Sequence, residues 1–74
     1  MAENMHRIMD AADFGKMVRE RRKALGYTQK YITEVTGISA SFISDLENGK
    51  GTAQLGKAMM IASLLGLNLY YSKR

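Results

Sequence analysis

The sequence predicts an all-α domain of four short helices followed by a short β-strand. Apolar residues recur at steps of three and four through most of the chain, which is the spacing of residues on one face of a helix. Between residues 28 and 50, two short helical patterns are separated by a few residues that include a glycine. From residue 67 the side chains alternate in character, which is typical of a strand.

The first helix is expected over residues 10–25. Asp10 precedes the apolar pattern and can accept a backbone N–H of the first turn, and Asp13 places negative charge near the positive end of the helix dipole. The expected inward stripe consists of Phe14, Met17, Val18 and Leu25. One four-residue step beyond Val18 stands Arg22, so its guanidinium is expected at the edge of the core, where it needs a carboxylate partner.

A second helix is expected over residues 29–36. The hydroxyl of Thr28 can cap it, and Ile32 and Val35 stand at helical spacing. Gly37 ends the helix, because a glycine readily takes the positive φ that lets the chain reverse within a few residues.

The third helix is expected over residues 40–48, with Ser39 as its N-cap. Ile43 and Leu46 lie three residues apart and form its inward stripe. The outward face then holds Ser41, Ser44, Asp45 and Asn48, and the flanks hold Ala40, Phe42 and Glu47. Because the outward side chains are short and polar, this helix can come close to another surface, such as a major groove about 12 Å wide.

A fourth helix is expected over residues 52–65, with Thr52 as its cap. One side carries Leu55, Ala58, Met59, Ala62 and Leu65, and the other carries Met60, Ile61 and Leu64. A helix that is apolar on two sides is buried on two sides, and a chain of 74 residues has no further helix to cover the second one. The pattern therefore predicts a partner subunit.

Residues 67–72 are expected to form a strand. Leu67, Leu69 and Tyr71 fall on one side of it, and Asn68, Tyr70 and Ser72 on the other. A lone strand cannot satisfy its backbone hydrogen bonds, so it must pair with the stretch from Met5 to Met9, with the same strand of a twofold-related chain, or with both. Residues 1–9 are then either a flexible lead or a short strand.

The composition limits the function classes. The chain has no cysteine, and its single histidine, His6, has no acidic cluster at ligand spacing, so we expect neither a metal nor a cofactor. No apolar run approaches the roughly 18 residues that span a membrane. Residues 1–10 lack the apolar core of a signal peptide, so a cytoplasmic location is expected.

The charge pattern favours a polyanionic partner. Eleven basic and seven acidic residues give a net charge of +4, and six of the basic residues fall within residues 16–30. When charge is considered alone, an ordinary solvated helix face is the better explanation of this cluster, and the two helical patterns of residues 28–50 reverse that preference. No proline, linker or repeat interrupts the chain, so residues 1–74 are expected to form one domain.

Residues 28–50 resemble the helix-turn-helix of the Cro/cI-type, or XRE-like, phage repressor family. The shared features are Thr28-Gln29, Gly37, the apolar Ile32, Ile38, Ile43 and Leu46, and the closing Leu46-Glu47-Asn48-Gly49-Lys50. The flanking segments 21–26 and 52–57 are similar to those of the small HipB-type antitoxin regulators, and the resemblance covers about residues 13–69. It implies a lambda-repressor-like four-helix domain that ends in a dimerising strand.

The chain departs from this family in two places. Thr33 and Thr36 stand where a compact apolar residue is usual, so the helices are slightly spread or the hydroxyls bond back to the preceding turn. Gly51 replaces a usual proline, which raises the entropy of the unfolded chain and lowers stability a little.

The resemblance implies that the helix over residues 40–48 enters the major groove and that a twofold dimer binds an inverted repeat with half-sites about 34 Å apart. It assigns base-facing positions to Ala40, Ser41, Ser44 and Asp45, and phosphate contacts to Thr28, Lys30, Ser39, Asn48 and Lys50. Gln29 reaches a phosphate, reaches the edge of an outer base, or only completes the cap. Phe42 touches a thymine methyl or packs on the flank of the core, and Lys50 is otherwise a solvated turn residue.

Two further sets of residues complete the expected site. Glu47 is the expected partner of Arg22, and this ion pair clamps the first helix to the DNA-facing helix. The dimer surface is expected at Met60, Ile61, Leu64, Leu67, Leu69 and Tyr71. The serines of the outward face have no nearby base to activate them, so we expect no enzyme.

These features predict a sequence-specific DNA-binding transcriptional regulator, a dimeric repressor in the bacterial cytoplasm and associated with the nucleoid. Its partners are double-stranded DNA and a second copy of the chain, with no membrane. A narrower form is the antitoxin of a toxin–antitoxin pair, which also binds a toxin protein. The alternative is a protein–protein interaction module, toxin-neutralising or scaffolding, with weak or vestigial DNA binding, because the base-facing side chains are short.

Overall fold

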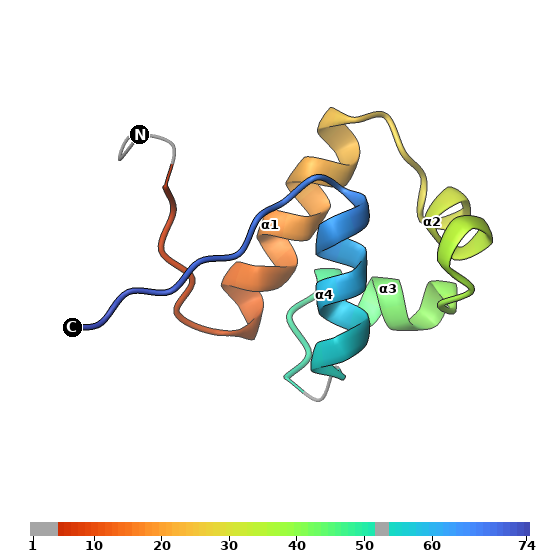
Figure 1. Cartoon of the computed structure of the whole chain (residues 1–74). Helices are drawn as coiled ribbons and strands as arrows, with labels where there is room; N and C mark the ends of the chain where they lie inside the picture. Colours follow the sequence, from red (N-terminus) through yellow and green to blue (C-terminus); the bar gives the residue numbers. More distant parts are fainter. Residues whose placement is uncertain (1–4, 52–53) are drawn as a thin grey trace.

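The computed structural model describes residues 5–51 and 54–74 and contains four helices (Figure 1). They are α1 (Ala11–Ala24), α2 (Gln29–Thr36), α3 (Ala40–Glu47) and α4 (Leu55–Leu64). α3 packs against both α1 and α2, and α4 contacts α2. The prediction of an all-helical, four-helix domain is confirmed. Within the described ranges, no helix has the length and apolar character needed to cross a membrane.

The first three helices begin at the residues expected to cap them. The side chains of Asp10, Thr28 and Ser39 each accept a hydrogen bond from the backbone N–H three residues further on, at distances between 2.8 and 3.1 Å. Each bond satisfies an amide that has no partner inside its own helix. These helix starts depend only on the nearby sequence, because the capping side chain and the amide that donates to it lie within one turn.

α4 begins later than expected. Its first residue is Leu55, and the preceding Gln54 is extended and forms no side-chain cap within the described part of the chain. The predicted cap, Thr52, lies outside the described residues.

The core lies where the helices meet. Its buried side chains are Val18, Ile32, Ile38, Ile43, Leu46, Ala58, Ile61 and Leu65. α1 and α3 approach so closely at Gly15 that a Cβ there would overlap the carbonyl oxygen of Leu46 and lie 2.9 Å from that of Glu47. Glycine at this position therefore sets the distance between α1 and α3, a role that the apolar pattern did not predict.

Two residues of the predicted apolar patterns are exposed, Leu25 of the inward stripe of the first helix and Val35, which stands at helical spacing from Ile32. Leu25 is 36% exposed because it lies one residue beyond the end of α1, where the helical period no longer holds. Val35 is 51% exposed because the rest of the domain covers only the Ile32 side of α2.

The rotation of α4 also differs from the prediction. Its buried residues are Ala58, Ile61 and Ala62, with Leu65 buried just after its end. Leu55 and Met59, expected on that side, are 69% and 47% exposed. Ile61, expected at a dimer surface, is fully buried in the core of its own chain. Because α4 is apolar nearly all round, the pattern does not determine its rotation, and packing against the other helices does.

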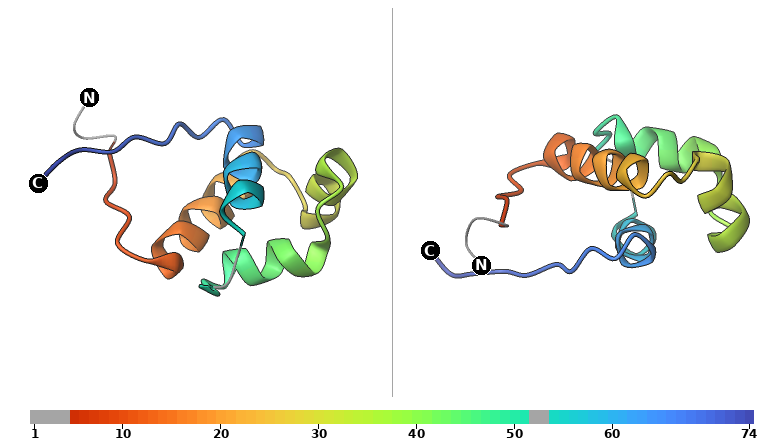
Figure 2. Two further views of the ribbon diagram at one scale, coloured as in Figure 1. Left: turned by 60° about the horizontal axis from the view of Figure 1, so that its bottom comes forward. Right: turned by 90° about the horizontal axis from the view of Figure 1, so that it is seen from above.

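The predicted C-terminal strand is wrong for the single chain. Residues 67–74 have no regular secondary structure, and no strand occurs anywhere in residues 5–51 and 54–74. A strand needs a neighbour for its N–H and C=O groups, and residues 5–10 do not supply one, although both segments leave the helical body on the same side (Figure 2). Among the described residues, a backbone hydrogen bond anchors the start of the C-terminal segment: the Leu67 N–H donates to the Ala62 carbonyl oxygen at 2.9 Å.

Candidate nucleic-acid interface

The turn between α2 and α3 is held by local hydrogen bonds and one buried side chain. Gly37 has a φ of 76°, and its N–H donates to the Thr33 carbonyl oxygen at 2.8 Å. The Thr36 hydroxyl donates to the Ile32 carbonyl oxygen at 2.7 Å and accepts the Ile38 N–H at 3.1 Å, so it bonds back to the preceding turn. The Thr33 hydroxyl is buried and has no hydrogen-bond partner within the described residues. The buried Ile38 side chain fixes the turn against the core.

α3 presents a polar outward face. Ala40 and Ser41 in its first turn are exposed, and Ser44 and Asp45 in its second are half-buried. The amide of Asn48 donates to the Ser44 hydroxyl at 3.4 Å, which ties the end of the helix to this face. The face therefore carries short hydrogen-bonding groups and no long cationic side chain.

Asp45 and Lys50, both expected to touch DNA, contact each other. Lys50 Nζ lies 3.3 Å from Asp45 Oδ1, and the two side chains are 63% and 46% exposed. A pair this open to solvent contributes little to stability, so a phosphate can replace the carboxylate as the partner of the ammonium group.

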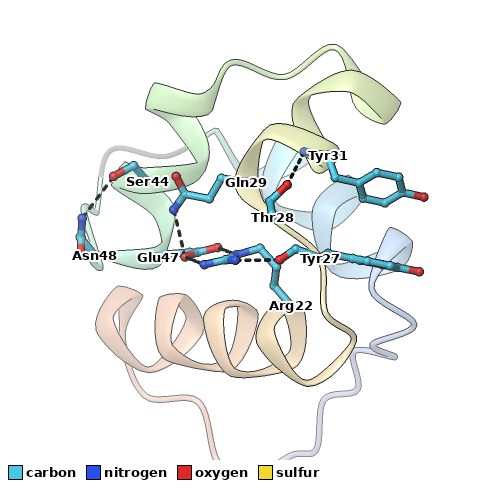
Figure 3. Close-up of polar contacts among 8 residues, drawn as sticks. All are labelled: Arg22, Tyr27, Thr28, Gln29, Tyr31, Ser44, Glu47 and Asn48. Atoms are coloured by element: carbon cyan, nitrogen blue, oxygen red, sulfur yellow. Dashed lines mark hydrogen bonds and ion pairs between the residues drawn. The ribbon is translucent and has the colours of Figure 1, made fainter.

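Arg22 of α1 and Glu47, the last residue of α3, form a buried ion pair. Arg22 Nε lies 2.6 Å from Glu47 Oε2, and Arg22 Nη2 donates to Glu47 Oε1 at 3.0 Å, so the guanidinium binds the carboxylate through two atoms (Figure 3). The side chains are only 11% and 3% exposed. The hydrogen bond to Glu47 raises the pKa of Arg22 against the opposing effect of burial, so the guanidinium remains charged. Arg22 Nη1 also donates to the Tyr27 carbonyl oxygen at 2.8 Å.

Gln29, the first residue of α2, joins the same network. Its Nε2 donates to Glu47 Oε1 at 3.2 Å. Glu47 thus links α1, through Arg22, and α2, through Gln29, to the end of α3. Gln29, Ser44 and Asn48 lie on one side of the domain, opposite the side chains of Tyr27 and Tyr31 (Figure 3).

The remaining expected contact residues divide into two groups. Thr28, Lys30 and Ser39 are exposed. Phe42 is half-buried and packs against the core, with Lys57 Nζ 5.6 Å from its ring centroid, so its position is that of a core-flanking aromatic. Lys57 was not among the predicted site residues, and its place in the first turn of α4 gives no sequence signal for this contact.

A model of the helix-turn-helix family, HTH_3, matches residues 18–72, which includes the motif, the second half of α1 and all of α4. The chain belongs to the helix-turn-helix family. Within that family it is of the XRE type, and the resemblance found in the sequence is confirmed.

This helix-turn-helix protein is similar to regulators from bacteria and to a phage protein. It is 41% identical over 63 residues to the uncharacterised HTH-type transcriptional regulator y4mF of Sinorhizobium fredii, covering 85% of this chain and 83% of that protein. It is 30% identical over 63 residues to an uncharacterised HTH-type transcriptional regulator of Haemophilus influenzae, covering 85% and 62%. It is 27% identical over 62 residues to the ImmF control region 10 kDa protein of Bacillus phage phi105, covering 84% and 69%.

The fold is shared with HipB. The helix-turn-helix protein matches the chain in a HipB-O4 20mer complex with a TM-score of 0.84 and 22% identity, over 93% of this chain and 97% of that one. A HipB variant in complex with an O2 20mer gives a TM-score of 0.85 and 22% identity, over 93% and 96%. At this level of identity the likeness establishes the fold.

The second apolar surface of the helix-turn-helix protein differs in part from the predicted one. Met60, Leu69 and Tyr71 are 52%, 42% and 92% exposed. Leu64 and Leu67 are half-buried and pack against the core. The exposed apolar face of α4 consists of Leu55, Met59 and Met60.

Proposed function

We propose that this protein is a sequence-specific DNA-binding repressor that acts as a dimer in the bacterial cytoplasm, with α3 lying in the major groove. The observation that carries the proposal is the outward face of α3, whose side chains are short and polar. The Arg22–Glu47 ion pair joins the other side of this helix to α1. Short side chains let the helix axis come close to the bases, and the buried pair holds the helix at a fixed angle. The fold shared with HipB in its O4 and O2 20mer complexes supports the same mode.

The contacts sort into base and phosphate sets. In this proposal Ala40, Ser41, Ser44 and Asp45 face the bases, where Ala40 suits a thymine methyl and Asp45 a cytosine amino group. In the same proposal, phosphates are bound by the backbone amides at the helix starts near Thr28 and Ser39 and by the side chains of Lys30, Asn48 and Lys50. With so few long side chains for bases, sequence-dependent DNA shape supplies part of the selectivity.

A second copy of the chain completes the binding unit. The exposed face of α4, formed by Leu55, Met59 and Met60, is the apolar surface for that contact. Residues 5–8, α1 and residues 67–70 also line an open groove of about 670 Å³, beside backbone that forms no strand in the described single chain. A twofold dimer places two α3 helices about 34 Å apart and so matches an inverted repeat.

A narrower proposal is that the protein is the antitoxin of a toxin–antitoxin pair. The exposed aromatic residues of the C-terminal segment, Tyr70 and Tyr71 at 81% and 92%, favour a further protein partner. An interaction module with weak DNA binding is the competing function, and it rests on the same apolar exposure together with the short side chains of α3. The antitoxin and a toxin-neutralising interaction module both bind a toxin protein, and co-purification of such a protein from the native host tests that binding.

The test of DNA binding is a gel-shift titration. Duplexes selected from a random pool, and the DNA upstream of the protein's own gene, are titrated at two salt concentrations beside a scrambled duplex of equal length. The repressor is expected to retain its selected duplex and to bind more weakly as salt rises, because each phosphate contact releases counterions. The absence of any shift at low salt contradicts the proposal and favours the interaction module.

A further inference from the structure

Gln29 is held by the same carboxylate that binds Arg22. Its Nε2 donates to Glu47 Oε1 at 3.2 Å, and Glu47 accepts from Arg22 at 2.6 and 3.0 Å. A carboxylate only accepts hydrogen bonds, so the amide must turn its nitrogen toward Glu47 and its oxygen away. The oxygen accordingly lies on the side of Ser44, on the outward face of α3 (Figure 3).

This orientation leaves one edge of the Gln29 amide for a ligand. The N–H of Gln29 that donates to Glu47 is the one that points away from the amide oxygen (Figure 3). The oxygen and the second N–H then lie side by side, as one acceptor and one donor. Adenine presents the complementary pair in the major groove, its N6 amino donor and its N7 acceptor. A phosphate presents acceptors only and would face the amide oxygen with a negative group.

We propose that Gln29, positioned by Glu47, reads an adenine next to the bases that α3 faces. The inference rests on the proposed function and assigns a specificity-determining residue to it. Glu47 touches no base and acts as a positioning residue, itself held by Arg22. The arrangement gives a long hydrogen-bonding side chain to a face whose own residues, such as Ala40 and Ser41, are short.

The experiment starts from duplexes that the wild-type chain selects from a random pool. Each adenine of a half-site is replaced in turn, and the affinity of wild type and Gln29→Ala is measured for every duplex. At one adenine per half-site the wild type is expected to lose roughly 5- to 150-fold, the range of a good bidentate contact, and Gln29→Ala is expected to be indifferent to the base there. Gln54→Ala removes an exposed glutamine outside the motif and is expected to keep the wild-type profile.

The positioning role of Glu47 is tested by two further variants. Arg22→Met with Glu47→Gln removes both buried charges, and the new amide at residue 47 both donates and accepts, so it no longer fixes the orientation of Gln29. Arg22→Met with Glu47→Leu keeps Gln29 and removes its hydrogen-bond acceptor at residue 47 altogether, again without leaving a buried charge. Both are expected to lose the adenine preference while the effects of other base changes persist. Circular dichroism first establishes that each variant is folded, and either double variant decides the point where the other is not folded.

The outcomes separate the inference from the function on which it rests. If Gln29→Ala weakens binding equally on all duplexes, Gln29 contacts a phosphate and the inference is overturned while DNA binding stands. If the two Glu47 variants weaken all duplexes equally, Glu47 is only structural and the positioning role is overturned. If the wild type selects no duplex, the proposed function fails and the inference fails with it.

Discussion

The guanidinium of Arg22 on α1 and the carboxylate of Glu47 at the end of α3 are joined by two hydrogen bonds, of 2.6 and 3.0 Å, in a site that is almost closed to solvent. The pair is the main polar link between the N-terminal helix and the helix proposed to read DNA. Burying the two charges costs a large desolvation free energy, and their mutual attraction offsets it. The Glu47 carboxylate therefore contributes both to the stability of the domain and to the proposed DNA-binding site.

Removing one partner of this pair is expected to be far worse than removing both. Arg22→Met leaves the Glu47 carboxylate buried without its counter-charge and is expected to cost about 3–5 kcal/mol of unfolding free energy. That is comparable to the whole stability of a domain of this size, so the variant is expected to be largely unfolded at 25 °C.

Arg22→Met combined with Glu47→Leu is expected to recover most of that loss, because no buried charge remains. Urea unfolding followed by circular dichroism measures all four members of the cycle. A double variant as unstable as the single one contradicts this account of the pair.

Gly15→Ala is expected to destabilise the domain by about 1–3 kcal/mol, since the added methyl meets the backbone of α3 and the two helices must separate. The control is Gly56→Ala in α4, where a Cβ would meet nothing within 4 Å among the described residues. That substitution is expected to leave stability unchanged or to raise it by roughly 0.5–1 kcal/mol. Melting temperatures of the two variants decide the matter, and equal shifts in the same direction count against close packing at Gly15.

Lys50→Ala is expected to lower the salt dependence of DNA binding. If Lys50 contacts one phosphate, the slope of log K against log salt becomes shallower by about 0.9 per chain. Lys16→Ala removes the same charge from an exposed position on α1, away from the motif, and is expected to keep the wild-type slope. Identical slopes for the two variants show that Lys50 contributes only to the overall charge.

Met60→Asp is expected to shift the protein from dimer to monomer, because it places a charge in the exposed apolar face of α4. Val35→Asp is the matched control, since Val35 is 51% exposed and Met60 is 52% exposed, but Val35 lies on α2. Sedimentation equilibrium of both variants measures the state. A Met60→Asp protein that remains dimeric places the subunit contact elsewhere.

The parts of the fold that the sequence predicts well are those decided by neighbours along the chain. Caps at Asp10, Thr28 and Ser39 and the left-handed Gly37 each depend on groups within one turn, so their residue types suffice. The pairing of Arg22 with Glu47 follows from a charge placed at a core position together with the family pattern.

What the sequence does not predict depends on packing between distant segments. The rotation of α4 is ambiguous because most of its faces are apolar, so Ile61 was assigned to the surface although it is fully buried. Gly15 gives no periodic signal, since its importance comes from the backbone of α3. The strand at residues 67–72 has the right alternation and lacks a pairing partner within the described chain.

The central claim is that the outward face of α3 binds DNA, and Ser41→Glu tests it most directly. Ser41 is exposed in the first turn of α3, and Ala24→Glu adds the same charge at an exposed position at the end of α1. Titration of a selected duplex with wild type and both variants is expected to show roughly a hundredfold loss or more for Ser41→Glu, from repulsion by the phosphates, and little change for Ala24→Glu. A Ser41→Glu protein that binds the duplex as tightly as the wild type contradicts the account.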